Sequence, residues 1–121
     1  MQGLHLTGDL FDCRCPTARL TDVAGLRRHC LDAVQTAGLT PVAELFHTFP
    51  DSSGITGVVL LAESHLAVHT RPEKNGATLD VYVCNFGADN SAEAHALCDA
   101  LKGYFASASA NMQTLKRGAL P

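Results

Sequence analysis

Hydrophobic and polar residues alternate with two different periods along this chain, and the periods predict strands and helices in a definite order. Apolar residues at Leu4, Leu6 and, after a break, Leu10 predict a first strand over residues 3–12. Thr21, a residue suited to an N-cap, precedes apolar residues at three- and four-residue spacing. This pattern predicts an amphipathic helix that stops at Gly38. Residues 39–49 alternate again and predict a second strand.

Three further strands are predicted in the middle of the chain. The run over residues 57–62 is continuously apolar, which is typical of a strand covered on both faces. Residues 65–70 and 79–84 alternate, so each of these strands is expected to bury one face. The segments 50–54 and 71–76 that separate these strands have the composition of turns and loops.

The last part of the chain predicts one more helix and one more strand. The helix is expected to begin near Asn90, with Glu93 placed for a capping box, and residues 108–115 predict the strand. The order is therefore β-α-β-β-β-β-α-β. Strands outnumber helices and most connections are short, which predicts an α+β fold, a two-layer α/β sandwich with a mainly antiparallel sheet and two helices on one face. The other face of the sheet would lack cover, and dimerisation is expected to supply it.

Composition and charge exclude several classes of protein. At 121 residues the chain is expected to be a single domain, residues 1–121, and its hydrophobic fraction of 46% argues against disorder. A net charge of -3 without a run of Lys or Arg argues against nucleic acid or an anionic membrane as a partner. No apolar run approaches the roughly 20 residues of a membrane span, and no signal-peptide pattern opens the chain. The expected location is cytoplasmic.

Cysteine usage points to reduced thiols. Five cysteines, an odd number, occur without a secretory signal. The Cys13-Arg14-Cys15 pair is not followed by a second pair at zinc-site spacing, so we expect no metal site there. Most of these cysteines are expected to be small core residues.

The residues with the greatest chemical capability lie between Glu63 and Glu73, with Cys84 on the next predicted strand. A serine hydroxyl, here that of Ser64, can attack the carbonyl of the residue before it and convert the peptide bond to an ester. A base that removes the Cα proton then drives β-elimination, and the dehydroalanine left behind hydrolyses to a pyruvoyl group. His65 and His69 are the candidates for that base.

A pyruvoyl group would give the chain a cofactor made from its own backbone. Its carbonyl forms a Schiff base with a substrate amine and accepts the electrons that are released when CO2 leaves. The resulting carbanion needs a proton, and the thiol of Cys84 is a candidate donor.

Residue chemistry alone leaves other interpretations open. Ser64 is also compatible with a simple β-turn, and Cys84 with a core position. His65 and His69 lie on the same face of a predicted strand, a spacing considered for a metal, although no third ligand accompanies them.

Several motifs together resemble those of a known family. The segment 46–84 resembles the short, single-domain S-adenosylmethionine decarboxylase proenzymes of bacteria and archaea, and the resemblance extends over almost the whole chain. The family pattern has FHxF, a glycine-rich turn, GV(S/T)GVV, ESHxxxHTWPE and then a cysteine. The matching text here is FHTF at 46–49, GITGVV at 54–59, ESHLAVHTRPE at 63–73 and DVYVC at 80–84, with HLTGDLFDC at 5–13 resembling the opening strand.

The resemblance implies a role for each processing residue. Cleavage between Glu63 and Ser64 would give a β chain of residues 1–63 and an α chain of residues 64–121, with the pyruvoyl (covalent pyruvate) cofactor formed from Ser64. His69 matches the proton acceptor in processing, and Cys84 matches the residue that protonates the product. Thr56 falls where the family often has a serine that assists ester formation.

The resemblance also implies substrate contacts and a homodimer of processed αβ units. Glu73 matches a glutamate that binds the ribose hydroxyls, and Phe49 matches an aromatic residue that stacks on adenine. The family's sites form between two protomers, so His69 and Glu73 would serve the Ser64 of the partner chain.

One position departs from the family pattern. Arg71 replaces the tryptophan that closes the other side of the adenine site, and a guanidinium can stack on a base through its planar face. We predict decarboxylation of S-adenosylmethionine, which supplies the aminopropyl donor for spermidine synthesis. The alternatives are a pyruvoyl-dependent L-arginine or L-ornithine decarboxylase, and a non-catalytic binding module on the same fold.

Overall fold

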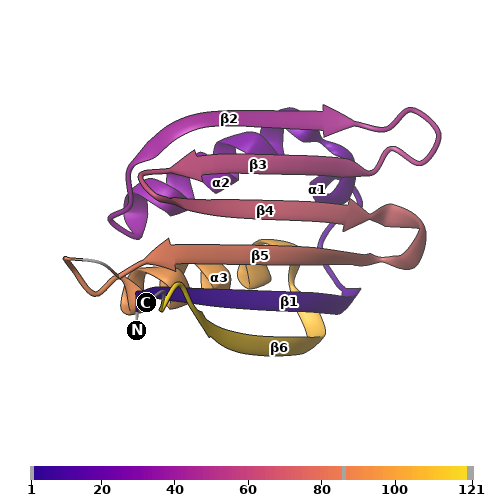
Figure 1. Cartoon of the computed structure of the whole chain (residues 1–121). Helices are drawn as coiled ribbons and strands as arrows, with labels where there is room; N and C mark the ends of the chain where they lie inside the picture. Colours follow the sequence, from indigo (N-terminus) through magenta and orange to yellow (C-terminus); the bar gives the residue numbers. More distant parts are fainter. Residues whose placement is uncertain (1, 86, 120–121) are drawn as a thin grey trace.

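Alternating segments of the chain pair into one antiparallel sheet, which a computed structural model describes over residues 2–85 and 87–119 (Figure 1). Within these residues the strand order is β2-β3-β4-β5-β1-β6, so the two ends of the chain contribute neighbouring strands. The strands are β1 (Gly3–Cys13), β2 (Pro41–Thr48), β3 (Ile55–Leu61), β4 (Ser64–Arg71), β5 (Gly76–Cys84) and β6 (Ser107–Arg117). The predicted α+β class and the predicted order of strands and long helices are confirmed.

The helices lie together behind the sheet in Figure 1 and cover one of its faces. They are α1 (Ala18–Thr21), α2 (Val23–Thr36) and α3 (Ser91–Phe105), with a 3-10 turn η1 (Pro72–Lys74) between β4 and β5. The short α1 was not predicted, because four residues are too few to show a period. Thr21 ends α1, and the extended backbone of Asp22 (ψ 99°) makes Asp22 the N-cap of α2.

The core lies between the helices and the covered face of the sheet. Leu26, Leu97 and Phe105 from the helices and Val59 and Val81 from the strands are fully buried. Gly57 of β3 is required by a close approach, because a Cβ atom there would lie 2.2 Å from ring atoms of Phe46. The left-handed backbone of Gly38 (φ 87°) follows α2 as predicted.

The expectation that the apolar run at 57–62 is covered on both faces is wrong for the single chain. β3 alternates between buried and less buried residues, and Leu60 is 48% exposed. The reason is that the helices cover only one face of the sheet.

The segment before α3 also differs from its prediction. Glu93 forms no capping box, because the backbone N–H of Asn90 already donates to Asn85 Oδ1 at 2.8 Å. The Asn90 side chain instead donates from Nδ2 to the carbonyl of Cys84 at 2.9 Å. Asn85 donates its backbone N–H to Gln2 at 2.7 Å. These amide contacts hold the end of β5 in place.

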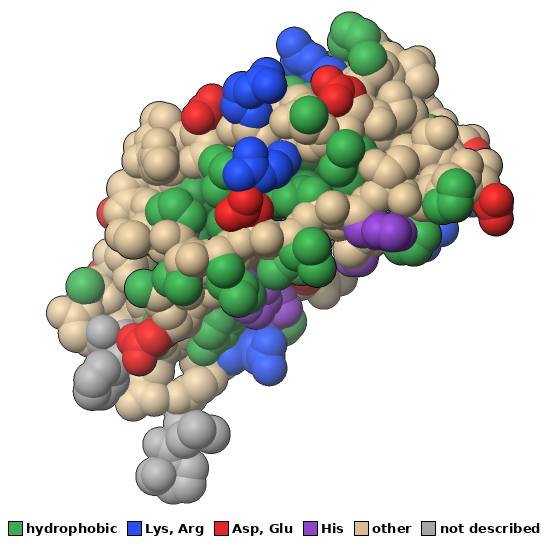
Figure 2. Space-filling model, turned by 90° about the horizontal axis from the view of Figure 1, so that it is seen from above, with side chains coloured by type: hydrophobic (Ala, Val, Ile, Leu, Met, Phe, Trp, Pro, Cys, Tyr) green, Lys and Arg blue, Asp and Glu red, His purple; other side chains and the backbone are tan. Residues whose placement is uncertain are grey.

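The second face of the sheet, which we call the open face, carries alternate residues of every strand. Its apolar members include Leu45, Leu60 and Leu115, all exposed. Ala43, Leu45, Val58 and Leu60 line a shallow apolar hollow on it. Figure 2 shows hydrophobic side chains exposed beside histidines on the molecule's surface.

Candidate active site

The bond between Glu63 and Ser64 lies in a strained turn. Leu61 and Ser64 are paired residues of the β3–β4 hairpin, so only Ala62 and Glu63 remain to reverse the chain. Glu63 adopts a left-handed backbone with φ 57°, a conformation that costs a residue with a Cβ about 1–3 kcal/mol. The sequence predicts a reactive serine here, and the fold adds a sterically costly backbone conformation at the residue that precedes it.

The hydroxyl of Ser64 is held by the neighbouring strand. The backbone N–H of Cys84 donates to Ser64 Oγ at 3.0 Å. Cys84 ends β5, next to β4 in the sheet, and its side chain is half-buried. The fold therefore brings together Ser64 and the backbone of Cys84, 20 residues apart in the sequence.

A cavity of about 480 Å³ opens beside Ser64 on the open face. His65 stacks on Tyr82 in this region, with ring centroids 5.7 Å apart and planes 24° from parallel. Burial, and then the neighbouring charge of His5, lower the pKa of His65. The cavity is lined by Glu63, Ser64, His65, Tyr82, Arg117 and Gly118.

A second cluster lies at the opposite end of β4. Thr56 of β3 and His69 of β4 are paired residues, and Thr56 Oγ1 lies 2.9 Å from His69 Nδ1. Thr78 of β5 is the paired residue on the other side of His69. Thr56 and His69 thus form a hydrogen-bonded pair suited to moving a proton.

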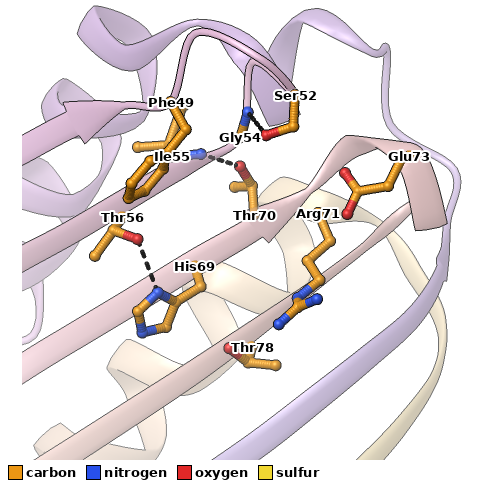
Figure 3. Close-up of a pocket in the computed structure, with 10 residues that line it drawn as sticks. All are labelled: Phe49, Ser52, Gly54, Ile55, Thr56, His69, Thr70, Arg71, Glu73 and Thr78. Carbon is orange, nitrogen blue, oxygen red and sulfur yellow. Dashed lines mark hydrogen bonds between the residues drawn. The ribbon is translucent and has the colours of Figure 1, made fainter.

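A cavity of about 320 Å³ surrounds this pair (Figure 3). The Phe49 ring and the Arg71 guanidinium stand at separate borders of it, and Glu73 lies beyond Arg71 on η1. The lining includes the predicted residues Phe49, Thr56, His69, Arg71 and Glu73, and also Ser52 and Thr78, which were not predicted from the sequence.

Thr70 is a further residue that was not predicted from the sequence. It is buried on the covered face of β4, where its hydroxyl donates to the carbonyl of Leu20 at 2.8 Å. The same oxygen accepts the backbone N–H of Ile55 at 2.8 Å. Thr70 therefore ties α1 to the start of β3 below the cavity. The sequence did contain a signal for this residue, because Thr70 carries a hydroxyl at a position where the alternation of β4 calls for an apolar side chain.

The two clusters do not meet within one chain. Ser64 and His69 are five residues apart on a strand, and a rise of about 3.3 Å per residue separates them by roughly 17 Å. A hydrogen bond spans about 3 Å. One chain therefore carries two half-sites, one with Ser64 and Cys84 and the other with Thr56, His69, Phe49, Arg71 and Glu73.

The metal alternative considered for His65 and His69 is not supported by the geometry. Four residues on a strand separate them by roughly 13 Å, too far for two imidazoles to share an ion. Across residues 2–85 and 87–119, no three His, Cys, Asp or Glu side chains cluster as metal ligands would. Within those same ranges, every helix is too short or too polar to cross a membrane.

Comparisons with known proteins identify similar chains. The family model described as S-adenosylmethionine decarboxylase matches residues 4–118. An S-adenosylmethionine decarboxylase proenzyme of Symbiobacterium thermophilum is 35% identical over 116 residues, which cover 96% of this chain and 83% of that protein. The crystal structure of the adenosylmethionine decarboxylase from Aquifex aeolicus VF5 superposes with a TM-score of 0.86 at 32% identity, covering 99% of this chain and 93% of that one.

Other relatives are longer than this chain. The proenzyme of Parasynechococcus marenigrum is 43% identical over 84 residues, which cover 69% of this chain and 63% of that protein. The chain thus spans less than two thirds of the length of this relative.

Proposed function

Because the chain belongs to the S-adenosylmethionine decarboxylase family, we propose that it is a self-processing, pyruvoyl-dependent decarboxylase acting on S-adenosylmethionine. The products would be CO2 and decarboxylated S-adenosylmethionine, the aminopropyl donor for spermidine. The observation that carries this proposal is the position of Ser64, hydrogen-bonded by Cys84 and directly after the strained Glu63.

Self-processing begins at the hydroxyl of Ser64. Its oxygen adds to the carbonyl carbon of Glu63, the C–N bond breaks and an ester replaces the amide. The left-handed backbone of Glu63 favours this step, because breaking the amide releases the strain. A base then takes the Cα proton of Ser64, the Cβ–O bond breaks, and Glu63 leaves as a carboxylate. Water hydrolyses the remaining dehydroalanine with loss of ammonia, leaving chains of residues 1–63 and 64–121.

We assign the base to His69 of a second copy of the chain. The separation of roughly 17 Å within one chain is too great for proton transfer. A two-fold dimer that faces the two open faces toward each other would join each Ser64 half-site to the other chain's Thr56–His69 half-site. The exposed Leu45, Leu60 and Leu115 supply apolar surface for such a contact. The hydrogen bond between Thr56 Oγ1 and His69 Nδ1 would orient the imidazole.

In this proposal the second half-site also binds the substrate. Phe49 and Arg71 offer an aromatic ring and a planar guanidinium for stacking on adenine, and Glu73 offers a carboxylate for the ribose hydroxyls. The carboxylate of Glu73 would also offset the repulsion between Arg71 and the sulfonium of the substrate.

The surroundings of Ser64 would suit a pyruvoyl group, because the Cys84 N–H that donates to Ser64 Oγ loses that acceptor when Oγ departs with Glu63 and is then available to the group. When present, that group accepts the electrons that decarboxylation releases. The backbone of Cys84 contacts Ser64, and we assign to its thiol the protonation of the product. The neutral form of His65, favoured by its lowered pKa, adds no positive charge near a cationic substrate.

Intact-mass measurement tests the proposal. Purified protein is expected to separate into fragments 1–63 and 64–121, with a pyruvoyl mass on the second, and Ser64→Ala is expected to remain whole. A wild-type chain that stays full-length after long incubation would refute self-processing and favour a binding module. A matched control is Ser91→Ala, which changes the first residue of α3 without touching the scissile bond.

Release of CO2 from S-adenosylmethionine, L-arginine and L-ornithine, measured side by side, tests the substrate. Activity is expected with S-adenosylmethionine, in agreement with the family and with the relatives' names. Activity with the amino acids alone would contradict the assignment. Arg71→Trp, which restores the family residue, is expected to lower the KM for S-adenosylmethionine.

A further inference from the structure

Arg117, the last residue of β6, is held over the open face by contacts with Tyr82 and His5. Its guanidinium lies 5.7 Å from the centre of the Tyr82 ring, and one of its nitrogens lies 3.3 Å from His5 Nδ1. An arginine only donates hydrogen bonds, so His5 Nδ1 accepts and the ring proton is on Nε2. His5 Nε2 in turn lies 3.1 Å from Asp80 Oδ1. Asp80 therefore orients Arg117 through His5.

This arginine lacks a carboxylate partner in residues 2–85 and 87–119, where the ion pairs join other side chains. The carboxylate nearest in its chain of contacts, Asp80, is already bound by His5. Arg117 nevertheless lines the same cavity as Glu63 and Ser64. A positioned guanidinium that has no counter-ion among the described residues, beside the scissile bond, is suited to receive an anion.

Self-cleavage would create an anion in this cavity. The carbonyl carbon of Glu63 leaves as a carboxylate, so the new chain end bears a main-chain and a side-chain negative charge. Leu61 is the last paired residue of β3, so Ala62, whose N–H donates to the Thr40 carbonyl at 3.3 Å, and Glu63 become the new chain end, with a reach of about 7 Å. Left beside the Ser64-derived group, this end would obstruct the substrate amine and repel the substrate carboxylate.

We propose that Arg117, positioned by the His5–Asp80 pair, binds the new C-terminal carboxylate of Glu63 after cleavage and keeps that chain end away from the reacting group. The inference rests on the proposed self-processing and assigns a site to one of its products. The expelled carboxylate and the guanidinium form a charge-assisted, two-point contact.

The substrate carboxylate is a less suitable occupant of this site. A decarboxylase gains rate only from contacts that are stronger in the transition state than in the bound substrate. A guanidinium that grips the carboxylate stabilises the charge that must be lost, and so raises the barrier. The Glu63 carboxylate is a final product of processing, and its binding carries no such penalty.

Trimming by a broad-specificity carboxypeptidase tests the proposal on the cleaved protein. Wild type, Arg117→Gln, Arg117→Lys and the control Arg14→Gln, an exposed arginine paired with Asp12, are digested without substrate. The mass of the β chain reports loss of Glu63, and only the cleaved fraction is scored. A contact worth about 1.4 kcal/mol corresponds to about tenfold faster loss of Glu63 in Arg117→Gln. Arg117→Lys is expected to lie between that rate and the wild-type rate.

Ionic strength provides a second readout within the wild-type protein. Raising salt from about 0.05 M to about 0.5 M is expected to speed trimming of wild type and to leave Arg117→Gln unchanged. Equal trimming of wild type and Arg117→Gln at low salt would overturn the inference, and so would a faster rate in Arg14→Gln. Failure of the wild type to cleave at all would instead overturn the proposed function, so the two failures are distinguishable.

Discussion

Two inactive variants are expected to restore self-cleavage when they share a dimer. Ser64→Ala lacks the attacking hydroxyl, and His69→Ala lacks the base, so neither should cleave alone. The structure separates these residues by roughly 17 Å on one strand, whereas proton transfer requires about 3 Å. In the proposed dimer, a mixed pair would bring the intact Ser64 of one chain to the intact His69 of the other.

The expected yield follows from random assembly. Co-expression in equal amounts makes about half of all dimers mixed, and each mixed dimer contains one complete site. About half of the His69→Ala chains should therefore appear as fragments 1–63 and 64–121, while the Ser64→Ala chains stay whole. Different affinity tags on the two chains allow intact mass to report each variant separately.

The result is decisive in either direction. A co-expressed pair that remains uncleaved, although mixed dimers are recovered through both tags, would refute assembly of the site from two chains. Cleavage of His69→Ala alone at the wild-type rate would show that His69 is not the base. His95→Ala, an exposed histidine on α3, serves as the matched control and is expected to cleave as wild type does.

Three further variants test separate parts of the structure. Cys84→Ala keeps the backbone N–H that binds Ser64, so cleavage should proceed. Its CO2 release should fall by about 100-fold because the proton donor is lost. Unchanged turnover would show that Cys84 does not protonate the product. Gly57→Ala forces a Cβ against Phe46 and should lower the free energy of unfolding in urea by about 1–3 kcal/mol. Gly103→Ala has open space around it and should raise that free energy by about 0.5–1 kcal/mol through α3. A stabilised Gly57→Ala and a destabilised Gly103→Ala would contradict the packing. Burial lowers the pKa of His29 from 6.5, so the unfolded state binds more protons and the unfolding free energy should fall as pH drops below about 6.5. His29→Gln should make the unfolding free energy less dependent on pH. An equally steep dependence in this variant would contradict the role of His29.

Much of the fold was predictable because local patterns and tertiary packing agree. The alternation at 79–84 became β5 with Leu79, Val81 and Val83 buried, and Gly38 ended α2. Two local predictions failed where tertiary contacts compete. Glu93 does not form the capping box because Asn85 bonds the N–H that it would have bound, and Leu60 is exposed because the helices cover the other face of the sheet.

Part of the candidate site was predictable and part was not. The motif from Glu63 to Glu73 identifies the reactive residues by type, and the pairing of Ser64 with Cys84 follows from neighbouring strands. Thr70, Tyr82 and Arg117 could not be predicted, because their contacts are with residues distant in the sequence. A local pattern of apolar and polar residues does not show such contacts.

The sequence by itself determined the order of strands and helices, the buried stripe of each, and which side chains can perform the chemistry, because these depend on side-chain type and on short-range periods. Only the tertiary structure decided that Ser64 and His69 lie at opposite ends of β4, that Glu63 is strained, and that Arg117 stands over the Ser64 cavity. Those facts depend on hairpin register and strand order, which are set by pairing the whole sheet at once.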